Sequence, residues 1–258
     1  MVTTGRESVK QIILKCVTIA HMQLSVVVPA YNEARRLPTT LQRLHDYWQQ
    51  QSNWSVEVIV VDDGSSDDTS NAVAALQFPE VQVLRQPHNA GKFAAFKRGV
   101  RAAQYEWVLL YDADGATPIA MLDNCLTPMT QYDLLVGSRR INRSNITVQQ
   151  SLPRQLFGRL AYLMIRTLTG VALKDTQCGF KLCRTEIAKA AVAQMQIDRF
   201  AGDVEFIYLV QLLGGRVQEI PVDWHDVPIS TVRPGDFFQS FRDVWKIRKR
   251  IRSGQYHR

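Results

Sequence analysis

The sequence has 258 residues, of which 46% are hydrophobic and 21% are charged, and its formal net charge is +7. This length and apolar content allow one sizeable core, and no low-complexity tract or linker marks a second domain. Four cysteines in a chain of this size do not make a disulfide framework, and the lack of a CxxC pair argues against zinc, so we expect reduced thiols in a cytoplasmic protein.

Apolar runs and amphipathic segments alternate along the first half of the chain. The runs 24–28, 56–61, 81–84 and 107–111 predict strands, and the segments 37–50, 66–76 and 93–103 predict helices. Such alternation predicts a single Rossmann-like α/β domain with a mostly parallel central sheet flanked by helices. We expect a poorly ordered extension over 1–22, the α/β domain over 23–235, and a basic amphipathic C-terminal helix or tail over 236–258.

Polar residues follow directly on three of the predicted strands. They lie at 31–33 (Tyr-Asn-Glu), 62–63 (Asp-Asp) and 112–114 (Asp-Ala-Asp). In sheets of this type, ligands bind beyond the carboxyl ends of the strands, so we expect these side chains to form one site. The chain lacks both GxGxxG and GxxxxGK[ST], which excludes the standard dinucleotide site and the P-loop.

Asp112 and Asp114 are candidates for a metal site. Two carboxylates spaced two residues apart after a strand can share a face, and hard oxygen ligands suit Mg²⁺ or Mn²⁺ with phosphate oxygens completing the shell. Such a metal would neutralise the charge that builds on a leaving diphosphate. The alternative is that both aspartates cap a turn.

Three further features are candidates for nucleotide contacts. Asp63, at a strand end, can accept a hydrogen bond from the imide N–H of uracil, whereas the acids at 67–68 are expected to cap the next helix. Tyr31 offers an aromatic face to a base. Gly91 and Lys92 begin a helix whose backbone N–H groups and ammonium suit a phosphate. Each feature also has an ordinary interpretation. Asp63 could cap a turn, Tyr31 could pack against the protein, and Lys92 could be a solvated lysine.

Four motifs, in this order and spacing, resemble glycosyltransferase family 2 with its GT-A fold. They are Pro-Ala-Tyr-Asn-Glu at 29–33, Val-Val-Asp-Asp-Gly-Ser at 60–65, Asn-Ala-Gly-Lys at 89–92 and Asp-Ala-Asp at 112–114. Later motifs are similar to the dolichyl-phosphate β-glucosyltransferase branch. These are Val-Gly-Ser-Arg at 136–139, Asp-Thr-Gln-Cys-Gly-Phe-Lys at 175–181, Asp-Val-Glu at 203–205 and Glu-Ile-Pro-Val at 219–222.

The resemblance implies roles for individual residues. The nucleotide sugar is expected to contact Pro29, Tyr31, Glu33, Val61, Asp63, Gly91, Lys92, Asp112 and Ala113. A metal is expected at Asp112 and Asp114. Catalytic roles are expected for Lys92, Asp112, Asp114, Arg139 and Asp175. Arg139 matches an arginine that reaches a donor or acceptor phosphate. Asp175 matches an aspartate near the reacting centre.

Two positions depart from the pattern of the family. Ala116 stands where related dolichyl-phosphate mannosyltransferases have a further polar metal ligand, so we expect water to fill that position. Ser230 and Thr231 replace the usual Ser-Lys pair, which puts the contact with the acceptor phosphate in doubt unless Arg233 supplies the charge.

The resemblance implies an inverting transfer of a hexose, glucose from UDP-glucose, to a polyprenyl phosphate such as dolichyl or undecaprenyl phosphate. A phosphate monoester is already anionic at neutral pH, so no strong general base is needed. Asp175 is then expected to position the acceptor or tune its charge. The alternatives are a family 2 enzyme with a soluble or polysaccharide acceptor, and a nucleotide-binding module without turnover.

Residues 236–252 predict a helix that lies on a membrane surface. One half of this helix is apolar and the other half basic, with Arg248 inside the apolar arc. The apolar half has Phe237, Phe238, Phe241, Val244, Trp245, Ile247 and Ile251, and the basic half has Arg242, Lys246, Lys249 and Arg250. The alternative is that the apolar half packs on the catalytic domain.

We expect the protein to be peripheral at the cytoplasmic face of an anionic membrane, because no apolar run approaches the roughly 20 residues of a spanning helix. A nucleic-acid partner is not expected, since the tail lacks a recognisable module and the cluster at the strand ends is acidic.

Overall fold

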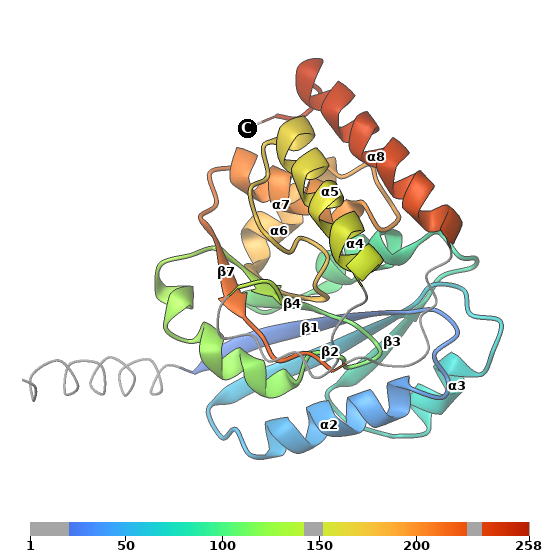
Figure 1. Ribbon diagram of the computed structural model, residues 1–258. Helices are drawn as coiled ribbons and strands as arrows, with labels where there is room; N and C mark the ends of the chain where they lie inside the picture. Colours follow the sequence, from blue (N-terminus) through green and yellow to red (C-terminus); the bar gives the residue numbers. More distant parts are fainter. Residues whose placement is uncertain (1–20, 142–151, 226–233, 258) are drawn as a thin grey trace, which may run out of the picture.

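The computed structural model describes residues 21–141, 152–225 and 234–257, with the side chains of 152–160 and 234–238 left out. Within these ranges the strands form one sheet in the order β3-β2-β1-β4-β6-β5-β7 (Figure 1). The strands are β1 (Met22–Ala30), β2 (Trp54–Asp62), β3 (Val81–Arg85), β4 (Trp107–Tyr111), β5 (Leu134–Ser138), β6 (Phe180–Arg184) and β7 (Val217–Pro221).

The sheet is mostly parallel. Strand β6 pairs antiparallel with both β4 and β5, whereas the other described pairs are parallel. The central strands are short apolar runs buried on both faces, as parallel strands covered by helices usually are. The predicted α/β fold with a mostly parallel sheet is therefore confirmed.

Helices cover both faces of the sheet (Figure 1). One face carries α2 (Leu37–Gln49), α3 (Thr69–Ala74), η1 (Ile119–Cys125) and η2 (Pro128–Thr130). The other face carries α4 (Lys92–Ala102), α5 (Leu152–Thr169), α6 (Thr185–Gln194), α7 (Gly202–Leu212) and α8 (Pro234–Arg252).

Successive residues of each strand point to opposite faces and so feed two separate cores. On β1, Val27 faces the core under α4, while Val26 and Val28 face the core under α2. The helix α4 lies very close to the sheet, because a Cβ atom at Gly99 would fall 2.3 Å from Val27. This close packing holds the amino end of α4 near the carboxyl ends of the strands.

The predicted strands and helices of the first half are all present, with their ends shifted by one or two residues except in one case. The helix expected over 66–76 begins at Thr69, because the residues before it are bonded to other segments. The backbone N–H of Ser66 donates to Asn32, and the carboxylate of Asp67 accepts the N–H of Ala34 at 3.1 Å and of Thr69 at 3.1 Å. Asp67 thus bonds to the first residue of the helix, whereas Asp68, the N-cap residue, makes no side-chain capping bond.

The C-terminal helix belongs to the same core as the α/β domain. The boundary expected at 236 falls inside α8, which begins at Pro234, and Val244, Ile247 and Tyr256 are buried with residues of α7. Met22 is the first residue of β1, while residues 1–20 and 226–233, with Ser230, Thr231 and Arg233, lie outside the described residues. Among the described residues, no helix combines the length and apolar character required to cross a bilayer.

Candidate active site

The loops after β1, β2 and β4 meet at one edge of the sheet. The three strands are neighbours and run parallel, so their carboxyl ends lie side by side. The first two loops are also bonded to each other. The backbone N–H of Asn32 donates to Ser65 Oγ at 2.9 Å, and the N–H of Ser66 donates to Asn32 Oδ1 at 2.9 Å. The cluster of polar strand ends expected from the sequence is therefore present.

Asp63 holds the loop that leads to α4. Its carboxylate is buried and accepts hydrogen bonds from Gln86 Nε2 at 2.6 Å, from the N–H of Ala90 at 2.9 Å and from the N–H of Gly91 at 2.8 Å. A carboxylate has about four acceptor positions, and these donors use three of them. One position is then left for a nucleobase, so loop support and base recognition are compatible at Asp63.

The other expected nucleoside contacts differ in how far they reach solvent. Tyr31 is 42% exposed, so its ring is accessible to a base. Glu33 is buried, and its carboxylate accepts a hydrogen bond from Arg36 Nε at 2.7 Å. Pro29 pairs with Val61 across β1 and β2. Val61 is fully buried, backbone included, and it is paired with Pro29 on one side and Leu84 on the other, so no part of it is exposed in this structure.

Lys92 and Asp112 form an ion pair at this edge, with Lys92 Nζ 2.7 Å from Asp112 Oδ1. Burial opposes ionisation of both groups, but the opposite charges outweigh it, so the pKa of Lys92 is raised and the pKa of Asp112 is lowered. Gly179 lies against the other carboxylate oxygen, since a Cβ atom there would fall 1.8 Å from Asp112 Oδ2. Asp112 is therefore a charged group fixed from two sides.

Asp114 lies in the turn that follows β4. Its Oδ1 accepts the N–H of Ala116 at 3.0 Å, and Thr40 Oγ1 donates to the carbonyl of Ala113 at 2.8 Å. Burial, and then the negative charge of Asp112, raise the pKa of Asp114. Two carboxylates that disfavour each other's ionisation form a site that gains from a bound cation.

A divalent metal fits this pair of carboxylates only together with other ligands. In the described part of the chain, no three His, Cys, Asp or Glu side chains are arranged to hold a metal ion. Mg²⁺ is commonly held by one or two carboxylates together with substrate phosphates and water. Asp112 and Asp114 suit that arrangement, in which a nucleotide diphosphate supplies the remaining oxygens.

The backbone at the start of α4 is already bonded to protein groups. The N–H of Gly91 donates to Asp63, and the N–H groups of Phe93 and Ala94 donate to the carbonyl of Asp198 at 2.8 and 3.2 Å. Gly91 has φ of 116°, a conformation that residues with a side chain rarely adopt. Because these N–H groups already donate to protein acceptors, we expect the phosphate to contact the ammonium group of Lys92 and not these backbone amides.

Arg139 and Asp175 form a second ion pair, in which Asp175 is buried. Arg139 Nε lies 2.7 Å from Asp175 Oδ2, Nη2 lies 3.0 Å from Oδ1, and the backbone N–H of Arg139 also donates to Oδ2 at 3.0 Å. Burial would raise the pKa of Asp175, but the hydrogen bonds and charge of Arg139 outweigh it and hold this pKa below its usual range. Asp175 therefore orients Arg139, and Arg139 is close enough to Asp112 to help lower the pKa of Asp112.

Three supporting contacts of the site were not expected from the sequence. Lys181 and Asp203 form an ion pair, both about 1% exposed, and the guanidinium of Arg139 lies 5.4 Å from the ring centre of Trp224. Gln86 donates to Asp63. A signal was present for Lys181 alone, because a lysine within a buried apolar strand needs a partner of opposite charge.

A family model described as Glycosyl transferase family 2 matches residues 25–191 of the chain. The chain belongs to this family. Dolichyl-phosphate beta-glucosyltransferases of Dictyostelium discoideum and Mus musculus are each 33% identical to it. The first aligns over 251 residues, 92% of this chain and 77% of the relative, and the second over 252 residues, 91% and 77%. The expected family and branch are confirmed, and this family 2 member is a glycosyltransferase.

Solved structures with lower identity share the fold. Glucosyl-3-phosphoglycerate synthase from Mycobacterium tuberculosis, in complex with UDP, is 17% identical with a TM-score of 0.65, covering 91% of this chain and 81% of its own. The mannosyltransferase PcManGT from Pyrobaculum calidifontis, in complex with GDP-Man and Mn²⁺, is 20% identical with a TM-score of 0.62, covering 93% and 66%. These likenesses confirm the GT-A fold of this glycosyltransferase.

Proposed function

We propose that this glycosyltransferase transfers glucose from UDP-glucose, with inversion, to the phosphate of a polyprenol such as dolichol or undecaprenol. The curated relatives named above carry dolichyl-phosphate beta-glucosyltransferase in their names and align over most of the chain. The observation that carries the proposal is a pair of cations near Asp112, namely Lys92, which pairs with Asp112 itself, and Arg139, which is held by the buried Asp175. Two phosphate groups, one from the donor and one from the acceptor, suit two such cations.

The donor nucleotide is proposed to bind across the ends of β1, β2 and β4. Tyr31 would stack on the uracil ring, and Asp63 would accept the imide N–H while it keeps its bonds to the 86–91 loop. Lys92 would then contact the diphosphate. A divalent ion, Mg²⁺ or Mn²⁺, held by Asp112 and Asp114, would neutralise the charge of the leaving diphosphate.

The acceptor phosphate is proposed to bind at Arg139. In the transfer, an oxygen of this phosphate forms a bond to the anomeric carbon while the bond from that carbon to the donor diphosphate breaks, which inverts the anomeric centre. The nucleophile is already an anion near neutral pH, so no proton has to be removed by a strong base. Asp175 fits this chemistry as the residue that orients Arg139, because its carboxylate is engaged with that guanidinium.

A transfer assay tests this function. Purified protein is incubated with radiolabelled UDP-glucose, UDP-galactose, GDP-glucose or GDP-mannose and a polyprenyl phosphate, and the lipid fraction is counted. We expect label in the lipid with UDP-glucose, and a β-linked glucosyl phosphate as the product. Label in a soluble or polysaccharide acceptor alone would contradict the lipid acceptor, and failure to release any sugar would favour a binding module without turnover.

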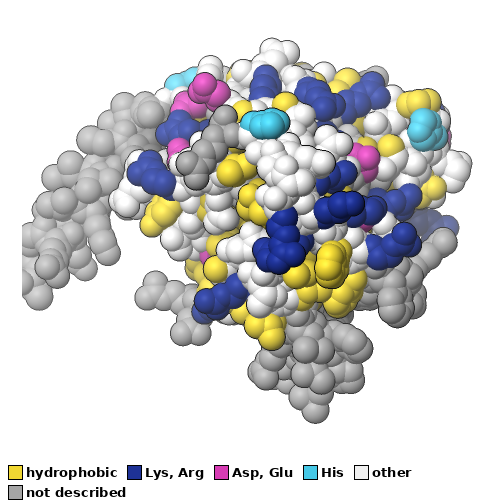
Figure 2. All heavy atoms as spheres, turned by 90° about the horizontal axis from the view of Figure 1, so that it is seen from above, with side chains coloured by type: hydrophobic (Ala, Val, Ile, Leu, Met, Phe, Trp, Pro, Cys, Tyr) yellow, Lys and Arg dark blue, Asp and Glu magenta, His cyan; other side chains and the backbone are white. Residues whose placement is uncertain are grey.

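The helix α8 supports a position at a membrane surface, where a lipid acceptor is found. Its apolar arc is divided: Val244 and Ile247 are buried against the domain, whereas Phe241 and Trp245 are 45% and 63% exposed. Leu163 of the neighbouring α5 is 56% exposed. Figure 2 looks onto this side of the molecule and shows hydrophobic side chains beside many Lys and Arg and few Asp and Glu. Phe237 and Phe238 lie outside the described side chains.

Three of the basic residues of α8 have partners in the protein. Lys246 Nζ lies 2.7 Å from Asp243 Oδ1, although half of the Lys246 side chain is exposed. Arg248 Nη1 donates to the carbonyl of Leu168 at 3.2 Å, at the end of α5, which explains a cation inside the apolar arc. Arg250 Nη1 lies 3.9 Å from Glu205. We therefore propose that Arg242 and Lys249, which line a surface hollow together with Phe241, Trp245 and Lys246, face anionic lipid.

Removing two of these charges should weaken membrane binding. We expect Arg242→Gln with Lys249→Gln to lower affinity for vesicles containing phosphatidylserine about 30-fold, at about 1 kcal/mol per basic residue. Trp245→Ala should weaken binding to vesicles further. High salt should remove the difference in vesicle affinity between the wild type and the double variant, because that difference is due to charge. Vesicle sedimentation measures both effects.

The matched control is Arg43→Gln with Arg216→Gln. Arg43 is exposed on α2, on the opposite face of the sheet, and Arg216 makes a surface contact with Asp133 that contributes little to stability. This variant has the same net charge and should bind vesicles like the wild type. Equal loss in both double variants would show that total charge, and not the α8 surface, governs membrane binding.

A further inference from the structure

A buried carboxylate on α7 joins three other segments of the chain. Glu205 is fully buried, and its Oε2 accepts the backbone N–H of Gln196 at 3.0 Å and of Ile197 at 2.7 Å. Its Oε1 accepts the hydroxyl of Tyr256 at 2.5 Å and lies 3.9 Å from Arg250 Nη1. Glu205 thus connects α7 with the loop before it, with α8 and with the C-terminal segment that follows α8.

The loop held by Glu205 also caps α4. One residue further along, the backbone carbonyl of Asp198 accepts the N–H groups of Phe93 at 2.8 Å and of Ala94 at 3.2 Å. A Cβ atom at Gly91 would fall 2.4 Å from the same carbonyl oxygen, so the loop lies directly against the start of the helix. Since Lys92 is the first residue of α4, its backbone is held between these contacts.

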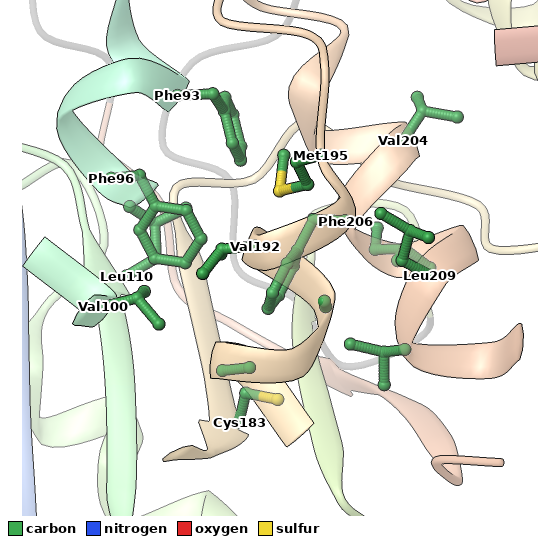
Figure 3. Packing of buried hydrophobic residues seen from close by; sticks show 14 of the residues in the cluster. Phe93, Phe96, Val100, Leu110, Cys183, Val192, Met195, Val204, Phe206 and Leu209 are labelled. Atoms are coloured by element: carbon green, nitrogen blue, oxygen red, sulfur yellow. The ribbon is translucent and has the colours of Figure 1, made fainter. Parts of the chain in front are cut away.

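Side-chain packing connects the same elements. The rings of Phe96 on α4 and Phe206 on α7 meet edge to face with their centres 5.2 Å apart. Figure 3 shows Phe93 and Phe96 directed toward Met195 and Phe206 in the core between these helices. A Cβ atom at Gly202, the first residue of α7, would fall 2.3 Å from the ring of Phe93. A shift of α7 or of its preceding loop would therefore reach the start of α4.

We propose that Glu205 and Tyr256 are positioning residues for Lys92, so that the hydrogen bond between them is needed for full affinity toward the donor diphosphate. The inference rests on the role of Lys92 in the proposed function. Asp63 supports the start of α4 from the side of β2, through Gly91. Glu205 supports it through the loop that carries the Asp198 carbonyl.

Tyr256 is suited to its part in this arrangement. Burial, and then its hydrogen bond to Glu205, raise the pKa of the phenol, so the hydroxyl stays protonated and donates at neutral pH. A buried carboxylate that loses a donor has to find another partner, and Glu205 could do so only by moving itself or its neighbours. The loop that caps α4 is among those neighbours.

Affinity for UDP tests the inference without an acceptor or turnover. We expect Tyr256→Phe to weaken UDP binding, measured by calorimetry with Mg²⁺, about fivefold, on the order of one lost hydrogen bond. Binding of uridine, which has no phosphate, should stay unchanged. In a Lys92→Ala background, which already binds UDP more weakly, adding Tyr256→Phe should have no further effect.

Gln194→Ala is the matched control. Gln194 holds the same C-terminal segment through both backbone groups of His257, at 2.7 and 2.9 Å, without contacting Glu205. This variant should bind UDP like the wild type. Equal weakening by Gln194→Ala, or equal weakening by Tyr256→Phe with and without Lys92, would overturn the inference and leave Tyr256 a residue of general stability.

A different donor nucleotide would affect only the proposed function. If the wild type does not bind UDP but transfers sugar from a GDP donor, the uridine assignment fails, and the same four variants are compared with GDP and guanosine. The coupling between Tyr256 and Lys92 is then decided by that comparison, because Lys92 is proposed to contact the diphosphate in either nucleotide.

Discussion

Asp114→Asn is expected to lower the rate of sugar transfer by about 100-fold or more, the usual cost of losing one preorganised electrostatic group. The substitution keeps the shape of the side chain but removes the charge of a proposed metal ligand. Excess EDTA should abolish transfer by the wild type, and added Mn²⁺ or Mg²⁺ should restore it. The measurement is the initial rate of label transfer from UDP-glucose to polyprenyl phosphate.

Asp123→Asn is the control for this substitution. Asp123 is exposed on η1, where its carboxylate accepts the hydroxyl of Tyr47 at 2.7 Å, outside the loops that follow β1, β2 and β4. We expect its rate to stay close to that of the wild type. Full transfer in the presence of EDTA, or a normal rate for Asp114→Asn, would rule out the proposed metal mechanism and leave Asp114 as a residue that caps its turn through Ala116.

The order of strands and helices in the first half of the chain and the position of the candidate site could be predicted because both depend on local patterns. Short apolar runs identify buried strands, and the polar residues directly after them are placed at one sheet edge by the parallel arrangement. Asp63, Asp112 and Asp114 were found in this way. The same reasoning could not show what each carboxylate contacts, because Gln86 and Gly179 come from other segments.

The start of α3, the second of the three helices expected in the first half of the chain, shows where local patterns fail. Serines and acids before an apolar run are typical of a helix start, yet the residues at 65–67 are held in a loop by Asn32, which lies more than 30 positions earlier in the sequence. The cap on α4 has the same character, because Asp198 supplies a backbone carbonyl that any residue type could supply. The residue type at position 198 therefore gives no signal for the cap on α4.

The C-terminal helix shows how a periodic pattern can be correct and still incomplete. A helical wheel places Val244 and Trp245 in one apolar arc, but α8 packs on its neighbours along one edge of that arc only, so Val244 is buried and Trp245 is exposed. Arg248 contradicts the wheel until the end of α5 is known to lie beside it. Docking on the domain thus accounts for Val244, whereas the proposed contact with lipid concerns exposed residues such as Trp245.

Gly179→Ala is expected to reduce transfer nearly as much as loss of Asp112 itself. A Cβ atom at this position would lie 1.8 Å from Oδ2 and 2.0 Å from Cγ of Asp112, far inside van der Waals contact. The Asp112 side chain would have to turn away, which would break its 2.7 Å contact with Lys92 and move a proposed metal ligand. We expect the transfer rate to fall about 100-fold or more, as for loss of a preorganised group.

Gly170→Ala separates this effect from the general cost of replacing glycine. Gly170 has φ of 79°, and a Cβ atom there would have no described neighbour within 4 Å, so alanine strains the backbone without contacting another described group. It should lower the melting temperature and leave the transfer rate unchanged. Gly179→Ala should lower the transfer rate and leave the melting temperature nearly unchanged. Gly179 does not require positive φ, so alanine does not strain the backbone there. The added methyl group displaces the side chain of Asp112, which is 35% exposed and has room to turn outward. Normal transfer by Gly179→Ala would show that catalysis does not depend on Asp112 being held where the structure places it.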